Sequence, residues 1–190
     1  MKTIKFFTLG CKVNQYDTQS IRERFIEKGF REIANSKKAG TYLINTCTVT
    51  ANADHKSRGA ILKAIRENRF GRVIVTGCMV KKDRDSLSKI NGVSAIISKN
   101  FFGDRISDFA LHTRAFLKIQ DGCNNSCSYC KVPLVRGRSK SRPLKEIMRD
   151  AQLLAQKGFK EIVLTGICLG SYGQDLNPES NLVDVINCIN

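Results

Sequence analysis

The segment IKFFTLGC, residues 4–11, is an apolar run that ends in a glycine and a cysteine. The same order of features recurs in TYLINTC, residues 41–47, and in VIVTGC, residues 73–78. Short apolar runs that are closed by turn residues are typical of buried strands. Stretches of roughly 10–15 residues with helical spacing of apolar side chains separate them, and this alternation predicts βαβ units with a parallel sheet.

The rest of the chain extends this pattern into two domains. The predicted helices of the first half span residues 14–28, 53–68 and 83–90, and a fourth strand spans 94–98. Residues 99–114 break the pattern and are predicted to connect the domains. Beyond them we expect strands at 115–120 and 161–165, a helix from Pro143 to about residue 157, and a helix at 181–189. The fold class is therefore α/β, with an open parallel sheet of the Rossmann or flavodoxin type over residues 1–112 and a second domain over residues 113–190.

The composition is that of a basic globular chain. Its 190 residues include 32 Lys and Arg against 17 Asp and Glu, a net charge of +15. This charge favours a polyanionic partner, most commonly nucleic acid, although a solubilising surface gives the same composition. The 42% of hydrophobic residues argues against a disordered chain. The sequence has neither an apolar run of about 18 residues nor a signal-peptide pattern, so we expect no membrane segment and a cytoplasmic location.

The first three cysteines occupy equivalent positions. Cys11, Cys47 and Cys78, which we call the sheet cysteines, each follow a predicted strand by one or two residues. Because the carboxyl ends of parallel strands lie at one edge of a sheet, where ligands bind, we expect these thiols to share a site. The alternative is three independent buried cysteines, each packed as a small apolar side chain.

Three further cysteines form a CxxxCxxC loop directly after a predicted strand. These are Cys123, Cys127 and Cys130, which we call the loop cysteines. Three thiolates on so short a loop can converge on zinc, copper(I) or an iron–sulfur cluster. Structural zinc normally takes four protein ligands, so three cysteines leave one metal position open, which suits reactive chemistry. A zinc knuckle with a distant fourth ligand is the alternative.

With this loop after a strand, the sequence resembles the radical S-adenosylmethionine (SAM) enzymes, and the sheet cysteines make it similar to the methylthiotransferases among them. The matching segments are TLGCKVNQYDT (8–18), NTCTVTANADHKSR (45–58), VTGCMV (75–80), KIQDGCNNSCSYCKVPLVRGRSKSR (118–142) and KEIVLTGICLGSYG (160–173). Within that family, GCKVNQYDT, TCTVT and DGCNNSCSYC most resemble the branch that acts on N6-threonylcarbamoyladenosine in tRNA.

The resemblance implies an enzyme with two 4Fe–4S clusters. The loop cysteines would hold the cluster whose open iron binds the amino and carboxylate groups of SAM and whose electron cleaves SAM to a 5′-deoxyadenosyl radical. That radical would abstract hydrogen from C2 of the modified adenine beside the anticodon. The sheet cysteines would hold an auxiliary cluster that carries the sulfur or methylthio group, and a second SAM would supply the methyl. The implied partners are tRNA, SAM and an unidentified electron donor.

The same resemblance gives roles to further residues. Tyr129 stands where the family has an aromatic side chain near the SAM adenine, with simple loop packing as the alternative. Gly166 would allow the amino group of SAM to approach the backbone closely. The basic stretch RGRSKSR would contact RNA phosphates, with a solvated loop as the alternative; its cations are Arg136, Arg138, Lys140 and Arg142.

Chain length sets the last expectation. A complete β/α barrel takes about 250 residues, whereas only residues 113–190 follow the first domain. We therefore expect the first part of a barrel, from a fragment or a truncated product, without activity on its own. Two other functions stay open: the same reaction on isopentenyladenosine or a ribosomal protein, and a non-enzymatic metal protein that binds RNA. Iron content and bound SAM distinguish the enzyme from the binding protein.

Overall fold

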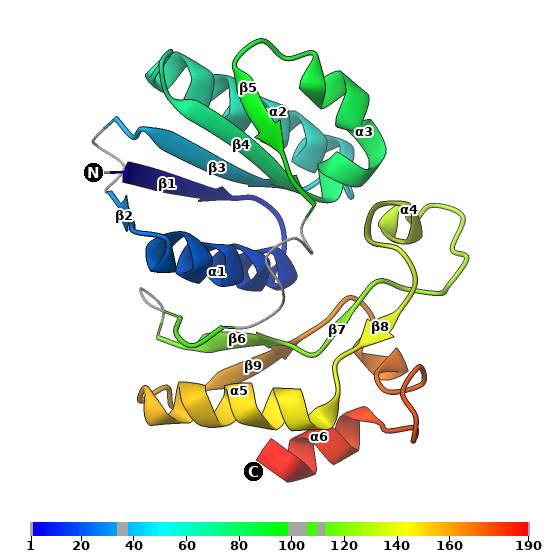
Figure 1. The fold of residues 1–190 in the computed structure, drawn as a ribbon. Helices are drawn as coiled ribbons and strands as arrows, with labels where there is room; N and C mark the ends of the chain where they lie inside the picture. The colour runs from blue at the N-terminus through cyan, green and yellow to red at the C-terminus, as the bar shows by residue number, and fades with distance from the viewer. Residues whose placement is uncertain (1, 34–37, 99–105, 110–112, 190) are drawn as a thin grey trace. The chain divides into compact units, whose positions relative to one another are not determined.

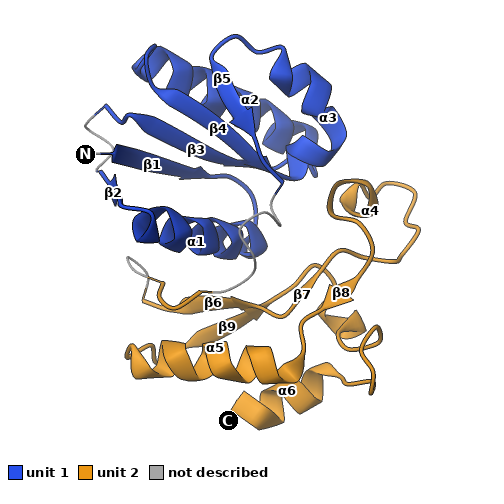
Figure 2. Ribbon diagram, in the orientation of Figure 1, with its two compact units in different colours: residues 1–104 blue, residues 105–190 orange. Residues whose placement is uncertain are grey.

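The computed structural model describes residues 2–33, 38–98, 106–109 and 113–189. It separates into two compact units, Met1–Asp104 and Arg105–Asn190 (Figure 2). The boundary predicted at residue 112, and most of the connection predicted at 99–114, lie outside the described residues. Both units combine helices with parallel strands, so the predicted α/β class is confirmed.

Strands and helices alternate along the first unit (Figure 1). Its described elements are β1 (Lys2–Thr8), α1 (Lys12–Glu27), β2 (Phe30–Glu32), β3 (Thr41–Thr46), α2 (Ala51–Glu67), β4 (Arg72–Gly77), α3 (Cys78–Ser88) and β5 (Val93–Ile96). The strands form one parallel sheet in the order β2-β1-β3-β4-β5. This is the strand order of flavodoxin-like folds, so the predicted open parallel sheet is confirmed.

The central strand β3 is buried on both faces, with all six of its residues inaccessible. Tyr42 and Ile44 pack in a cluster with side chains of α2 and α3, whereas Leu43 packs with Ile21 and Phe25 of α1. Successive side chains of a strand point to opposite faces, so the two clusters cover the two sides of the sheet. Figure 1 accordingly shows α1 on one side and α2 with α3 on the other. Burial on both faces explains the unbroken apolar run of this strand.

Two elements of the first unit differ from the prediction for local reasons. The sequence pattern does not predict β2, which is only three residues long and pairs with β1 at the edge of the sheet. Helix α3 begins at Cys78 and is kinked at Asp83, whose backbone is not helical, so the predicted helix near 83–90 corresponds to its second part. Its first part was not predicted; there Gly77, with φ +98°, turns the chain directly from β4 into the helix. A Cβ at Gly77 would lie 2.3 Å from the carbonyl oxygen of Thr46, so this turn requires glycine.

The second unit is built around a βαβ arrangement. Its described elements are β6 (Ala115–Lys118), β7 (Gln120–Asp121), α4 (Val132–Arg136), β8 (Lys140–Ser141), α5 (Leu144–Gln156), β9 (Ile162–Thr165), the 3₁₀ helix η2 (Leu169–Ser171) and α6 (Leu182–Ile189). Strands β6 and β9 pair in parallel, and β7 pairs with β8 in antiparallel orientation. The predicted strands and helices are all present, although the predicted strand 115–120 is divided between β6 and the start of β7. Helix α4 and strand β8 lie in segments that the sequence pattern describes as loops.

Helix α5 covers the parallel pair with one apolar face. Ile147, Ala151 and Leu154 are buried at helical spacing, and α5 packs on β6, all of whose residues are buried. This β6-α5-β9 unit is the repeating element from which β/α barrels are built. Among the helices that the structure describes, none combines the length and the apolar character needed to cross a membrane.

Candidate functional site

The sheet cysteines lie at one edge of the first unit. Cys11 is the N-cap of α1, Cys47 directly follows β3, and Cys78 is the first residue of α3. Because β1, β3 and β4 are neighbouring parallel strands, their carboxyl ends meet at this edge. Cys11 is exposed, whereas Cys47 and Cys78 are buried. The strand order therefore places the three sheet cysteines at a single edge, as expected, and Cys11 is the exposed one.

Two of the three cysteine-bearing segments touch directly. Gly10 precedes Cys11 and has φ +102°, a conformation that favours glycine. A Cβ at Gly10 would lie 2.9 Å from Cβ and 3.0 Å from Sγ of Cys47. The absent side chain at Gly10 thus makes the space that Cys47 occupies. Any larger residue at this position would separate the segments that carry Cys11 and Cys47.

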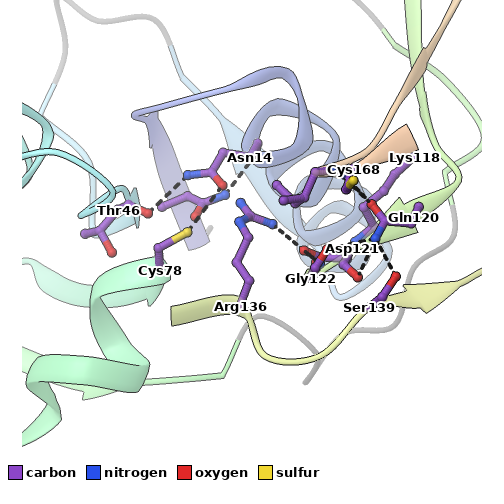
Figure 3. Close-up of polar contacts among 12 residues, drawn as sticks. Asn14, Thr46, Cys78, Lys118, Gln120, Asp121, Gly122, Arg136, Ser139 and Cys168 are labelled. Atoms are coloured by element: carbon purple, nitrogen blue, oxygen red, sulfur yellow. Dashed lines mark hydrogen bonds and ion pairs between the residues drawn. The ribbon is translucent and has the colours of Figure 1, made fainter. Parts of the chain in front are cut away.

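Asn14 joins all three segments through one side-chain amide. Its Nδ2 donates hydrogen bonds to the carbonyl oxygens of Leu9, at 2.6 Å, and Thr46, at 3.1 Å. The Sγ of Cys78 donates to its Oδ1 at 3.9 Å. Figure 3 shows Asn14 between Thr46 and Cys78. Asn14 is buried on the first turns of α1, so the motif GCKVNQYDT places a linking amide beside its own cysteine.

A second layer of polar groups supports this link. Asn45 Nδ2 donates to the carbonyl oxygen of Asn14 at 2.9 Å and to Thr18 Oγ1 at 3.0 Å. Ser57 Oγ of α2 accepts from the backbone N–H of Cys47 at 3.0 Å and donates to its carbonyl oxygen at 2.8 Å. Buried polar groups fix a geometry when their bonds are satisfied. Asn45 Oδ1 is an exception at this edge, since it is buried without a hydrogen-bond partner among the described residues.

The beginning of α2 carries a carboxylate with a perturbed pKa at the same edge. Asp54 Oδ1 accepts from Thr48 Oγ1 at 2.6 Å, and Arg58 Nε lies 3.1 Å from Asp54 Oδ2. Burial opposes ionisation of Asp54, but the hydrogen bonds from Thr48 and Arg58 and the nearby positive charges together lower its pKa below the ordinary value. The ionised carboxylate therefore holds the segment after Cys47 to α2.

The loop cysteines line a single pocket in the second unit. This pocket has a volume of about 630 Å³, and its lining includes Cys123, Cys127, Cys130, Leu134 and Arg138. The loop is shaped by its own backbone, since the N–H of Cys130 donates to the carbonyl oxygen of Cys127 at 3.0 Å and the N–H of Cys123 donates to Gly137 at 3.1 Å. Three thiols around one cavity are a suitable donor set for a thiolate-bound metal centre.

Neither group of cysteines is arranged as a finished metal site. All eight cysteines fall within the described part of the chain, and none of them forms a disulfide bond. Within that part, no three Cys, His, Asp or Glu side chains gather closely enough to hold a metal ion. The chemistry of the donors fits iron–sulfur clusters at both places, and cluster binding by the sheet and loop cysteines stays a prediction.

The residues predicted to contact SAM differ in their surroundings. Tyr129 lies in the cysteine loop with 88% of its surface exposed, so it is not part of the packing of that loop. Gly166 follows β9, and a Cβ there would lie 2.7 Å from Leu169 Cδ2 and 3.1 Å from Gln120 Oε1. The close approach at this glycine is therefore, in this structure, an approach to the side chains of Leu169 and Gln120. Contacts of Tyr129 and Gly166 with SAM stay predictions.

The basic stretch divides into buried and exposed cations. Arg136 is buried, with Nη1 2.8 Å from Asp121 Oδ1, and Arg142 is buried, with Nη2 2.7 Å from Asp150 Oδ2. These two guanidinium groups hold the second unit together, which leaves them poorly placed to bind phosphate. Arg138 and Lys140 are exposed. The sequence pattern shows the charges of this stretch but not the acidic partners that bury two of them.

Two linking residues have no signal in the sequence pattern. Asn14 of the first unit and Gln120 of the second are buried amides. Each stands beside a cysteine segment, in GCKVNQYDT and KIQDGC, but neither residue type suggests a ligand. Only the placement of an uncharged polar residue within three residues of a predicted ligand could have drawn attention to them.

Comparison with known proteins gives matches for both units. Residues 3–98 match the Uncharacterized protein family UPF0004, and residues 117–168 match the Radical SAM superfamily. The chain is 40% identical over 206 residues to the "Threonylcarbamoyladenosine tRNA methylthiotransferase MtaB" of Bacillus subtilis (strain 168), covering 93% of this chain and 46% of that protein. It is 36% identical to the protein of the same name from Aquifex aeolicus (strain VF5), covering 90% and 49%.

A relative with another printed target is also similar. This is the "tRNA-2-methylthio-N(6)-dimethylallyladenosine synthase" of Petrotoga mobilis (strain DSM 10674 / SJ95), which is 31% identical over 96% of this chain and 49% of that protein. The chain thus spans about half the length of the curated relatives it matches.

Proposed function

This chain belongs to the UPF0004 family and joins it to a Radical SAM segment, and on that premise we propose that its protein is a tRNA methylthiotransferase. The proposed reaction is radical SAM insertion of a methylthio group at C2 of N6-threonylcarbamoyladenosine, next to the anticodon. The substrate class is taken from relatives at 36–40% identity whose names carry threonylcarbamoyladenosine tRNA. The relative named for dimethylallyladenosine is 31% identical, which is the lower end of the 31–40% found for the relatives named for threonylcarbamoyladenosine.

One observation carries the proposal. The three loop cysteines line a single cavity of about 630 Å³ directly after the first strands of the Radical SAM segment. Membership of that superfamily implies SAM and a 4Fe–4S cluster as cofactors. When bound, the cluster supplies the electron that cleaves SAM to the radical that removes the substrate hydrogen. In our proposal the loop cysteines hold this cluster, and the exposed ring of Tyr129 stacks on the adenine of SAM.

A second 4Fe–4S cluster is proposed at the edge of the first sheet. The sheet cysteines would hold it, and Asn14 would keep the three ligand-bearing segments together through its hydrogen bonds to Leu9, Thr46 and Cys78. Cys11 is exposed, whereas Cys47 and Cys78 are buried, so in our proposal the site opens to solvent on the side of Cys11. This side would therefore receive the sulfur that is transferred.

RNA contact is proposed for a reduced set of cations. Arg138 and Lys140 are exposed, and Arg138 also lines the pocket of the loop cysteines. A phosphate held there would lie beside the proposed cluster, and the net charge of +15 favours the approach of a polyanion. Arg136 and Arg142 would hold the second unit together through Asp121 and Asp150 without touching the RNA. The cytoplasm is the proposed location because tRNA is the proposed substrate, and the electron donor is a partner of unassigned identity.

The test is nucleoside analysis of tRNA from a strain that lacks the gene. We expect loss of the methylthio form of threonylcarbamoyladenosine, with restoration by the wild-type gene but not by Cys123→Ser or Cys47→Ser. Cys188→Ser is the matched control, since this exposed thiol belongs to neither group of cysteines. An unchanged nucleoside profile in the deletion strain would refute the proposed substrate. Restoration by Cys47→Ser would refute the second cluster.

A further inference from the structure

We propose that Gln120 is a positioning residue that holds the cysteine loop and the loop after β9 in one fixed arrangement, so that both can bind the same molecule of SAM. The inference rests on the proposed function, because it concerns the SAM site of the second unit. It adds a residue that makes no contact with cluster or SAM but sets the distance between the two segments that do.

Gln120 is fully buried and stands at the junction of the relevant segments. It is the first residue of β7, directly before the cysteine loop, and its exposed fraction is 0%. An uncharged polar side chain at such a position is costly unless its hydrogen bonds are made. Both the oxygen and the nitrogen of the Gln120 amide make hydrogen bonds.

The oxygen of the amide binds the loop that follows β9. Gln120 Oε1 accepts hydrogen bonds from the backbone N–H groups of Ile167 and Cys168, both at 2.9 Å. Gly166 allows this approach, because a Cβ there would lie 3.1 Å from Gln120 Oε1 and 3.2 Å from its Cβ. The glycine and the glutamine therefore form one packing arrangement at the end of β9.

The nitrogen of the amide binds the cysteine loop and the basic stretch. Gln120 Nε2 donates to the carbonyl oxygen of Gly122 at 2.7 Å and to Ser139 Oγ at 2.8 Å (Figure 3). Gly122 directly precedes Cys123, and Ser139 N donates in turn to Asn124 Oδ1 within the loop at 3.0 Å. One side chain thus binds the start of the cysteine loop directly and, through Ser139, the segment that contacts Asn124 of that loop.

The residue type follows from these partners. Two backbone N–H groups require an acceptor, while a carbonyl and a hydroxyl oxygen are bound by a donor, and a primary amide supplies both. The partners also fix which end of the amide is oxygen, since reversing it would oppose donors to donors. Leucine would lose all of these bonds, and an ionised glutamate would keep the acceptor and lose the donors.

The consequence concerns SAM more than the cluster. The ligands of the cluster are the thiols themselves, which remain on one short loop whatever residue stands at position 120. SAM, in contrast, would contact the cysteine loop at one end and the backbone near Gly166 at the other. The affinity for SAM therefore depends on how the cysteine loop and the loop after β9, which Gln120 joins, are placed relative to each other. Cluster assembly depends on the cysteine loop alone.

The test compares Gln120→Leu, Gln120→Glu and the control Gln152→Glu in the protein as its own gene encodes it, reconstituted anaerobically with iron and sulfide. Gln152 is exposed on α5, so its substitution adds the same charge without breaking a buried link. Iron per chain, SAM affinity by equilibrium dialysis, and amide hydrogen exchange over residues 162–168 before reconstitution are measured for each variant.

We expect Gln120→Leu to bind SAM about tenfold or more weakly and to exchange the Ile167 and Cys168 amides about tenfold faster, because the N–H groups of these half-buried residues lose their acceptor. Gln120→Glu should weaken SAM binding while these amides stay protected, and iron content should match the wild type in all variants. SAM affinity within twofold of wild type in Gln120→Leu would overturn the inference. An equal loss of iron content and SAM binding in both Gln120 variants would also overturn the inference, because that is the result expected if Gln120 only stabilises the fold. Absence of cluster or SAM binding in the wild type would instead overturn the proposed function, and the inference with it.

Discussion

Substitution of Asn14 by Asp tests whether one amide holds the edge of the first sheet together. The change keeps the shape of the side chain but replaces the donor Nδ2 by an oxygen. The hydrogen bonds to the carbonyl oxygens of Leu9 and Thr46, at 2.6 and 3.1 Å, then become contacts between oxygens. A buried acceptor that loses its donor costs about 1–3 kcal/mol; Thr46 is buried and Leu9 is half-buried, so the two together cost about 2–4 kcal/mol. That is a large part of the roughly 5–15 kcal/mol that stabilises a typical domain.

Two assays measure the loss of stability in Asn14→Asp and show where in the protein it occurs. Urea denaturation followed by circular dichroism measures the free energy of unfolding, and the rate at which a thiol reagent labels Cys47 and Cys78 measures opening of the sheet edge. Both thiols are buried, so their labelling requires that edge to open. A loss of 2 kcal/mol corresponds to labelling about 30-fold faster, while the loop cysteines should react as in the wild type.

Asn91→Asp is the matched control for this measurement. Asn91 is exposed in the turn after α3, so the same exchange of amide for acid there should change the stability by less than about 0.5 kcal/mol. The reasoning is refuted if Asn14→Asp behaves like this control in denaturation and leaves the labelling of Cys47 and Cys78 unchanged.

Two further substitutions test the buried charges. Asp150→Asn removes the charge that pairs with the buried Arg142 and should destabilise the protein by about 3–5 kcal/mol; a shift of the urea midpoint within experimental error would show that the pair does not anchor α5. Asp54→Asn should cost about 1 kcal/mol at pH 7. The pKa of Asp54 is lowered below its ordinary 3.8 by folding, so its contribution is complete above the unfolded pKa and is lost as the pH falls through the folded pKa. Unfolding measured from pH 7 to pH 2 should therefore show the variant and the wild type converging in acid, and a constant difference would contradict this assignment.

The sheet of the first unit was predictable because its signals are local and repeated. Each of β1, β3 and β4 is an apolar run closed by a turn, and the order of strands and helices limits how parallel strands can be arranged. Strand β2 was missed because three residues carry no periodicity. The early start of α3 was missed because Gly77 indicates a turn of some kind, while the φ that leads directly into a helix depends on packing against Thr46.

The sequence predicts the cysteines of the candidate site but not the residues whose hydrogen bonds hold the cysteine-bearing segments in place. Cysteine is rare enough that position alone singles it out, and strand ends place it at an edge. Asn14 and Gln120 act through partners that lie far away in the sequence, such as Thr46 and Cys168. Arg142 is likewise buried because Asp150 of α5 pairs with it, whereas a count of charges in the sequence treats both as surface residues.

The distribution of the thiols also bears on how such a protein matures. Three segments from separate βα units meet only after β1, β3 and β4 have paired, so a nascent chain offers no binding place for iron there until most of the first unit has left the ribosome. The thiols at residues 123–130 are contiguous in the chain and need no such pairing. On the proposed assignment of ligands, metal delivery to the sheet edge requires a folded first unit, whereas delivery to the loop requires only that residues 123–130 have been synthesised.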